Sequence, residues 1–299
     1  MNIIDFHSHI DDILYGGEIV EPYSKRPWTP GNIFEVSEYR IAGMKWPFEF
    51  ISHHLEAIYV AHHIQFGTIE NMKKSMEQFG VTQSVLLPIA PMTDGFQYLK
   101  KAKDDKRFFV FASVSPHDPD KEKKLKAQIE AGCVGLKLHP VLQNASPEHQ
   151  GYFEILEIFR KYKMPVLFHS GIVVYYVAYQ PRRYGCGEPA KFEKLIKAFP
   201  DIPIVMGHMG IKQGEQVIEL ARKYDNIYAD GSNQRLSLLK KALPAFGKHR
   251  LMFGSDWPTS RQIIPIRIGI KLTKGDPEFQ EKFFFKNARS ILPEETPVI

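Results

Sequence analysis

Short apolar segments alternate with longer amphipathic segments along most of the chain. Eight apolar segments are rich in β-branched and aromatic residues and have the length of buried strands: residues 3–7, 84–88, 108–114, 134–139, 166–169, 202–208, 227–230 and 251–256. Six amphipathic segments with helical spacing lie between them: residues 68–79, 121–131, 152–162, 191–199, 214–224 and 236–246. The alternation predicts parallel βαβ units, because most successive strands leave room for one crossover helix.

Eight strands with interleaved helices favour an α/β protein of the (β/α)8 type, a TIM-type barrel, over a doubly wound open sheet. The phosphate-binding motifs GxGxxG and GxxxxGK[ST], which mark many open sheets that bind nucleotides, do not occur. No internal repeat or linker is evident, so residues 1–299 are expected to form a single domain. A long insertion, rich in proline and tryptophan, separates the first strand from the second.

The composition is that of a folded globular protein, with 43% hydrophobic and 24% charged residues. No apolar stretch is long enough to cross a bilayer, and the N-terminus lacks the features of a signal peptide. Two cysteines without a CxxC pair fit a reducing compartment. We therefore expect a cytoplasmic protein without a membrane partner.

The formal net charge of +5 suits an anionic ligand but is too small to indicate nucleic acid. The denser lysine runs are mixed with acidic residues and are typical of solvated helix faces. A homodimer is compatible with the sequence, although no interface stripe is evident.

Ionisable residues occur at the ends of several predicted strands. His7 and His9 lie at the end of the first strand, and their i, i+2 spacing points both imidazoles to one face. His169, His208 and Asp256 end three later strands. Because the carboxyl ends of barrel strands meet at one end of the barrel, these residues predict a shared metal site there.

Other polar residues near these strand ends have more than one possible role. Lys137 and His139 share one strand face; the lysine is either a carbamylated metal ligand, a cation for a substrate carboxylate, or the partner of a nearby acid. Asp230 either reinforces the site or caps a turn. Arg182 and Arg183 follow the strand that ends at His169 and either clamp a carboxylate or lie in a surface turn.

The chain resembles the amidohydrolase superfamily, in particular the amidohydrolase-related branch that also contains decarboxylases and hydratases. The resemblance covers nearly the whole chain and rests on five segments in the family order: Asp5-Phe-His-Ser-His, Gly135-Leu-Lys-Leu-His-Pro, Phe168-His-Ser-Gly, Met206-Gly-His-Met-Gly and Phe253-Gly-Ser-Asp-Trp-Pro.

The resemblance implies that His7, His9, His169 and Asp256 bind a divalent metal, with zinc as the first choice and manganese as the alternative. His208 would be a ligand of a second metal or would polarise the substrate. The number of metals, one or two per chain, depends on whether Lys137 is carbamylated. Imidazole and carboxylate ligands suit both metals.

Two enzymatic functions are compatible with these residues, of which hydrolysis is the first choice and decarboxylation the alternative. In the first, the metal activates water, Asp256 accepts its proton, and an ester, lactone or amide of a small organic acid is hydrolysed. In the second, an unsaturated or aromatic carboxylic acid loses carbon dioxide without oxidation, with Arg182 or Arg183 and aromatic residues holding its ring. For either reaction the candidate substrate-binding residues are Lys137, His139, Arg182 and Arg183. A non-catalytic protein with a closed structural metal site is a third reading, and the spare ionisable residues argue against it.

Overall fold

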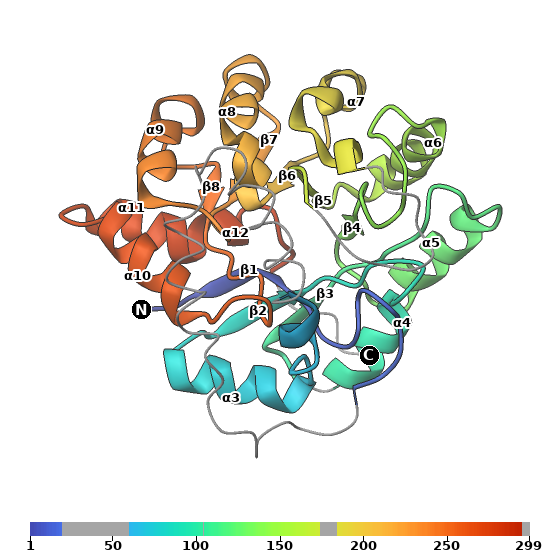
Figure 1. Ribbon diagram of the computed structural model, residues 1–299, viewed down its shortest axis with the longest axis horizontal. Helices are drawn as coiled ribbons and strands as arrows, with labels where there is room; N and C mark the ends of the chain where they lie inside the picture. Colours follow the sequence, from blue (N-terminus) through green and yellow to red (C-terminus); the bar gives the residue numbers. More distant parts are fainter. Residues whose placement is uncertain (20–59, 104, 174–183, 295–299) are drawn as a thin grey trace, which may run out of the picture.

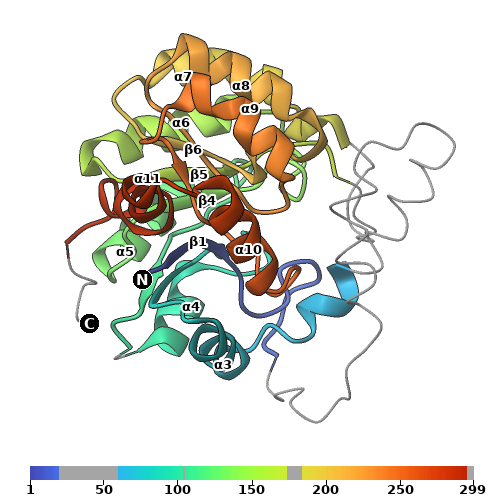
Figure 2. The ribbon, with the colours of Figure 1, turned by 90° about the vertical axis from the view of Figure 1, so that its left-hand side faces the viewer.

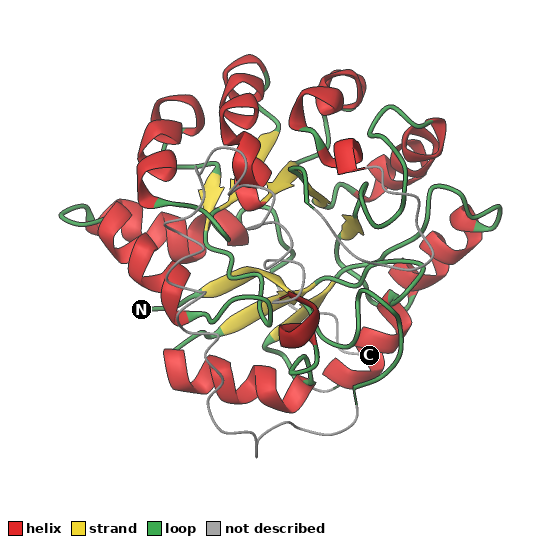
Figure 3. Ribbon diagram, viewed as in Figure 1, coloured by secondary structure: helices red, strands yellow, loops and turns green. Residues whose placement is uncertain are grey.

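The computed structural model describes residues 1–19, 60–103, 105–173 and 184–294. Eight strands lie near the centre of the molecule, surrounded by helices (Figures 1 and 3). The strands are β1 (Ile4–Ser8), β2 (Gln83–Leu86), β3 (Phe108–Val110), β4 (Leu136–Leu138), β5 (Val166–His169), β6 (Ile204–Gly207), β7 (Ile227–Asp230) and β8 (Leu251–Met252). The fold is therefore the expected α/β barrel architecture.

All pairs of neighbouring strands are parallel, in the orders β1-β2-β3 and β4-β5-β6-β7-β8. Backbone hydrogen bonds also connect these two groups. Ala112 pairs with Leu136 after β3, and Ser8 pairs with Trp257 after β8. The Phe6 amide donates to Phe253 at 3.0 Å across the second junction. These bonds join the eight strands into a ring, which brings the residues after β1 and β8 together.

The helices form the outer layer, as the two views at right angles show (Figures 1 and 2). They are α3 (Ile69–Phe79), α4 (Gly95–Ala102), α5 (Lys121–Glu130), α6 (Gln150–Phe159), α7 (Glu193–Ala198), α8 (Gly214–Lys223), α9 (Leu236–Phe246), α10 (Ile263–Leu272), α11 (Pro277–Glu281) and α12 (Asn287–Arg289). Local signals set the ends of α3: the Thr68 hydroxyl accepts the Asn71 amide at 3.1 Å, and Gly80 has φ +71°.

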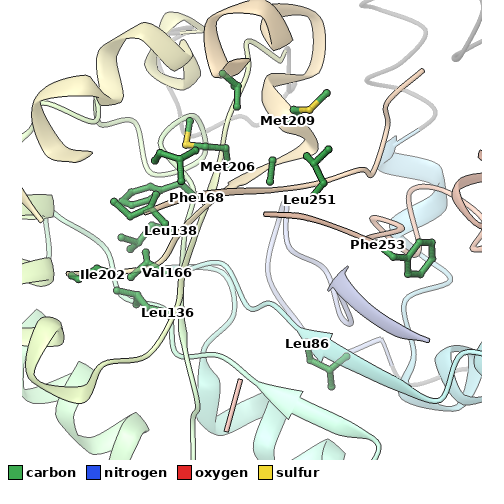
Figure 4. Packing of buried hydrophobic residues seen from close by; sticks show 14 of the residues in the cluster. Leu86, Leu136, Leu138, Val166, Phe168, Ile202, Met206, Met209, Leu251 and Phe253 are labelled. Atoms are coloured by element: carbon green, nitrogen blue, oxygen red, sulfur yellow. The ribbon is translucent and has the colours of Figure 1, made fainter. Parts of the chain in front are cut away.

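The strands contribute to two apolar layers. Leu136 and Leu138 of β4 and Phe168 of β5 pack in a buried cluster that also contains residues of the surrounding helices (Figure 4). Leu167 of β5 and Val205 of β6 belong to a second cluster, built mainly from strand residues. Successive residues of a strand therefore face the helices and the barrel interior in turn. Toward the carboxyl end of the strands, the interior positions carry polar side chains instead of apolar ones.

The predicted strands are all present, but five of them (β2, β3, β4, β6 and β8) are shorter than their apolar segments suggested. β6 ends before His208 and β8 ends well before Asp256, whereas the prediction extended both strands to those residues. His208 has φ +57° and Asp256 has φ +61°. A left-handed backbone cannot continue a strand ladder, so these two residues lie on turns beyond the strands.

The connection between β1 and β2 spans residues 9–82 and contains α3, in agreement with the expected insertion after the first strand. Its central part, residues 20–59, lies outside the described residues. Among the described residues, no helix combines the length and the apolar composition needed to cross a membrane. Helices α4, α10, α11 and α12 had no counterpart in the sequence-based prediction.

Candidate metal centre

Three of the predicted ligands, His7, His9 and Asp256, lie together beyond the carboxyl ends of β1 and β8. The Oδ1 atom of Asp256 is 3.4 Å from Nε2 of His9 and 3.7 Å from Nε2 of His7. All three residues are buried, and one potential ligand atom from each lies within 4.8 Å of the others. A cation placed between these atoms would have two imidazole ligands and one carboxylate ligand.

The two histidines of β1 are oriented by the hydrogen bonds of their other ring nitrogens. Nδ1 of His9 is 2.6 Å from the Leu87 carbonyl oxygen, which accepts its proton. Nδ1 of His7 is 2.9 Å from Oδ2 of Asp230. Each bond holds the proton on Nδ1 and leaves the lone pair of Nε2 directed toward Asp256, which is how metal-binding histidines are commonly held.

An irregularity in β1 gives His7 its position. Ile4 and Phe6 belong to the cluster of strand residues that contains Leu167. Strict alternation would point His7 to the opposite face, yet it contacts Lys137 and Asp230 of the interior. The register of β1 against β2 shifts between Asp5 and Ser8. Such a shift re-aims a side chain, and it allows Phe6 and His7 both to face the interior.

Two glycines make room for this arrangement. A Cβ atom on Gly207 would lie 3.1 Å from Cε1 of His7 and 2.8 Å from a backbone oxygen of Phe168. A Cβ atom on Gly254 would lie 2.9 Å from Oδ1 of Asp230. All three distances are shorter than ordinary van der Waals contacts, so a larger residue at either position would displace His7 or Asp230.

Asp256 is held on both of its oxygens. Oδ1 faces the two Nε2 atoms, and Oδ2 accepts hydrogen bonds from Nδ2 of Asn233 at 2.8 Å and Oγ1 of Thr259 at 2.5 Å. Burial by itself raises the pKa of Asp256, but His208, His9 and His7 together hold it well below its ordinary value. The side chain is therefore an anion near neutral pH.

His169, the fourth predicted ligand, lies nearby but outside the group formed by the other three. Its ring stacks on that of His139 with the centroids 4.0 Å apart and is 5.0 Å from the ring of His208. Nε2 of His169 is buried and has no hydrogen-bond partner among the described residues. A buried nitrogen without a partner is costly, and a metal ligand role would satisfy it. This donor set therefore fits a divalent cation.

His208 lies on an unusual turn. Its Nδ1 is 2.7 Å from Oγ of Ser232, and its ring stacks on that of His7 at 4.3 Å. His208, Met209 and Ile211 all have positive φ, which non-glycine residues rarely adopt. Hydrogen bonds from Nε2 of Gln234 to the carbonyl oxygens of His208 and Ile211 hold this turn in place. Burial lowers the pKa of His208 to about 3.

Lys137 is fully buried in the middle of these groups. Its Nζ is 3.4 Å from Nε2 of His7. Burial lowers the pKa of Lys137 to about 7, against the opposing charges of Asp256 and Asp230. The amine is therefore divided between its neutral and charged forms near neutral pH, and both the carbamylated and the cationic readings of this lysine stay proposals.

The structure assigns contacts to residues that the sequence analysis treated differently. Asp230 had two readings, and it contacts His7 directly. Ser232, Asn233 and Thr259 were not singled out, although they follow the ends of predicted strands, as the other site residues do. Arg182 and Arg183, the predicted carboxylate clamp, lie outside the described residues.

The buried histidines predict how the stability of the metal-free protein depends on pH. Burial lowers the pKa values of His7, His139, His169 and His208, so below about pH 6.5 these residues gain protons mainly in the unfolded chain. The free energy of unfolding should fall with falling pH, by up to about 5 kcal/mol per pH unit for four protons. The raised pKa values of Asp5 and Asp230 oppose this trend in part.

Urea denaturation of chelator-treated protein at several pH values between about 5 and 8 measures this dependence. The midpoint should fall steeply below the ordinary histidine pKa. A midpoint that is constant from pH 7 to pH 5 would show that these histidines are not held neutral in the folded protein.

A parallel barrel with histidines and an aspartate gathered beyond the carboxyl ends of its strands defines a class of metal-dependent barrel enzymes. The chain belongs to the amidohydrolase family, because the sequence model described as "Amidohydrolase" matches residues 4–293. Members of this family are metal-dependent enzymes and include both hydrolases and decarboxylases.

Solved structures of low sequence identity share the fold. An uncharacterised TIM-barrel protein from Bordetella bronchiseptica has a TM-score of 0.66 at 16% identity, covering 97% of this chain and 98% of its own. The 5-carboxyvanillate decarboxylase of Novosphingobium aromaticivorans, complexed with manganese and a nitrobenzoic acid, has a TM-score of 0.64 at 13% identity, covering 96% and 95%.

A probable 2-pyrone-4,6-dicarboxylic acid hydrolase from Acinetobacter baumannii, with citric acid bound, has a TM-score of 0.60 at 14% identity, covering 97% and 99%. A search of curated protein sequences finds no match. The comparisons therefore establish the family and the fold, and they leave the reaction to be inferred from the site.

Proposed function

We propose that this protein is a metal-dependent decarboxylase that removes carbon dioxide from a small unsaturated or aromatic carboxylic acid without oxidation. The contacts of Asp256 carry this choice over hydrolysis. Its Oδ2 already accepts two hydrogen bonds, and its Oδ1 faces the two Nε2 atoms that would share a cation. These contacts and the low pKa of Asp256 make it a weak proton acceptor, whereas the hydrolytic reading requires it to take a proton from an attacking water.

His7, His9 and Asp256 would hold the metal, with His169 as a further ligand. A bound divalent cation would polarise the oxygen atoms of the substrate and fix their position. Two or three imidazoles and one carboxylate suit both manganese and zinc. We place manganese first for testing because the similar 5-carboxyvanillate decarboxylase was crystallised with it.

His208 and Lys137 supply the remaining chemistry. His208 is neutral near pH 7, because burial lowers its pKa, and the ring nitrogen not engaged by Ser232 can relay a proton from water. The bond to the carboxylate carbon of the ionised substrate breaks, carbon dioxide leaves, and the electron pair left on the substrate takes that proton through His208, so that one hydroxide ion remains in solution. Lys137, beside His7, stabilises the negative charge that develops on the substrate as this bond breaks.

A substrate panel tests the proposal directly. The manganese-loaded and zinc-loaded proteins would be incubated with hydroxylated benzoic acids, and separately with pyrone lactones and simple amides. We expect release of carbon dioxide from a member of the first group, detected by a coupled bicarbonate assay, and loss of that release in a His208→Gln variant.

Hydrolysis of a lactone is the second candidate, which the similarity to the probable pyrone dicarboxylic acid hydrolase favours. Ring opening of a lactone without release of carbon dioxide would overturn the decarboxylase proposal and support this one. A chelator-treated sample, which should be inactive in either case, is the control for metal dependence.

A further inference from the structure

A chain of buried polar groups connects Asp230 at the end of β7 to His208 beyond β6. Oγ of Ser232 is 2.7 Å from Nδ1 of His208 and forms a short hydrogen bond with Oδ1 of Asp230. All three residues are buried, with exposed fractions of 3% or less. Each of these groups has a fixed set of donors and acceptors, so the direction of each hydrogen bond can be assigned one by one.

Asp230 acts as an acceptor on both oxygens. The backbone amide of Ser232 donates to Oδ1 at 3.0 Å, and the backbone amide of His208 is 3.3 Å from both oxygens. Nδ1 of His7 is 2.9 Å from Oδ2. A peptide N–H can only donate, so these contacts fit an ionised carboxylate. The Ser232 hydroxyl therefore donates its proton to Oδ1.

A serine hydroxyl has one proton, and in Ser232 that proton is directed to Asp230. Its oxygen can then only accept from Nδ1 of His208. We propose that Ser232 is a positioning residue that links His208 to Asp230 and fixes His208 as the tautomer with its proton on Nδ1. Asp230 thus sets the tautomers of two histidines, that of His7 directly and that of His208 through Ser232.

Asn233 offers the competing arrangement. Its Nδ2 is 3.5 Å from Nδ1 of His208, and a real hydrogen bond there would require a lone pair on that nitrogen. The same Nδ2 donates to Oδ2 of Asp256 at 2.8 Å. The contact of Nδ1 with Ser232 is 2.7 Å long, whereas that with Asn233 is 3.5 Å long. The shorter Ser232 hydrogen bond therefore decides the tautomer.

The consequence is that Nε2 of His208 has a lone pair and no proton in the neutral ring. This nitrogen can accept a proton or bind a cation, but it cannot donate a hydrogen bond to a substrate carbonyl oxygen. Only this catalytic consequence rests on the proposed function. The tautomer itself is a property of the metal-free protein and can be measured without a substrate.

Nuclear magnetic resonance of chelator-treated protein with isotope-labelled histidine measures the tautomer. Long-range correlations between ring nitrogens and carbon-bound protons distinguish Nδ1–H from Nε2–H, and a His208→Gln variant identifies the signals of His208. At about pH 8, above the ordinary histidine pKa, we expect the Nδ1–H form to dominate in the wild type. In Ser232→Ala the ratio of the Nδ1–H form to the Nε2–H form should fall about tenfold, which corresponds to the loss of one hydrogen bond.

Two further variants sharpen the experiment. Ser232→Thr keeps the hydroxyl and should restore the Nδ1–H form. Ser113→Ala removes another buried hydroxyl, which bonds to the Lys137 carbonyl and contacts no histidine ring, and it should leave His208 unchanged. A dominant Nε2–H form in the wild type overturns the proposal even if Ser232→Ala does not fold, as does an unchanged tautomer in a folded Ser232→Ala. Absence of decarboxylation would affect neither result.

Discussion

Replacing Asp256 with Asn is expected to weaken binding of manganese or zinc strongly. Loss of a residue that only hydrogen-bonds to a metal ligand costs roughly 10–100-fold in affinity, and loss of the ligand itself should cost more. Asp256 supplies the only carboxylate in the group formed with His7 and His9. The amide keeps the size of the side chain but removes its negative charge. Titration of chelator-treated protein with each metal, followed by calorimetry, measures the change, and release of carbon dioxide should fall with metal occupancy.

Asp11→Asn is the matched control for this variant. Asp11 is also a buried carboxylate and lies two residues after His9, but its oxygens face Lys101 at 2.5 Å, Gln97 at 2.7 Å and the Ile19 amide at 3.3 Å. This control should lose stability and keep the metal affinity of the wild type. Equal affinity of Asp256→Asn and wild type would remove Asp256 from the ligand set.

Lys137→Met is expected to reduce decarboxylation by at least about 100-fold, the usual cost of removing one charged group that stabilises a transition state. It should leave the number of bound metals at one per chain. The physical reason is the position of Nζ, 3.4 Å from Nε2 of His7, which places the amine beside the proposed metal site without making it a ligand. Elemental analysis and the bicarbonate assay measure the two quantities.

The same variant changes how stability depends on pH. The pKa of Lys137 is about 7 in the folded protein and 10.5 in the unfolded chain, so between these values the unfolded chain binds the extra proton. The free energy of unfolding of the metal-free wild type should therefore rise with pH above about 7, by up to about 1.4 kcal/mol per unit. Lys137→Met should lose this contribution.

A different outcome would identify a different chemistry. Two metals per wild-type chain, falling to one in Lys137→Met, would indicate a carbamylated lysine that bridges them. An acid-labile mass increment of one carbon dioxide on the wild type would support that reading. Unchanged activity in Lys137→Met would exclude both catalytic roles for this residue.

The alternation of strands and helices could be predicted from the sequence because it depends on local information. Each buried strand is a short apolar run, and each covering helix has an apolar stripe at its own period. The residues that end the strands could be found for the same reason: His7, His9 and His169 are polar residues placed directly after apolar runs. Their convergence then follows from the geometry of a parallel barrel.

The limits of that prediction also have physical causes. Only Gly207 separates the apolar run from His208, and only Gly254 and Ser255 separate it from Asp256, so the prediction extended both strands across these residues and too far. Backbone angles decide the end of a strand, and positive φ at a non-glycine residue has no reliable sequence signal. The shift in β1 that allows Phe6 and His7 to share the interior is likewise invisible in the alternation of residues.

The sequence by itself determined the order of the eight strands, the family and the strand ends at which ionisable residues accumulate. The tertiary structure decided which nitrogen of each histidine faces the site and what holds Asp256. Those properties depend on hydrogen bonds between residues far apart in the chain, such as His7 with Asp230 and Asn233 with Asp256. Local sequence patterns describe single elements, whereas the direction of a proton depends on a neighbour that only the closed barrel provides.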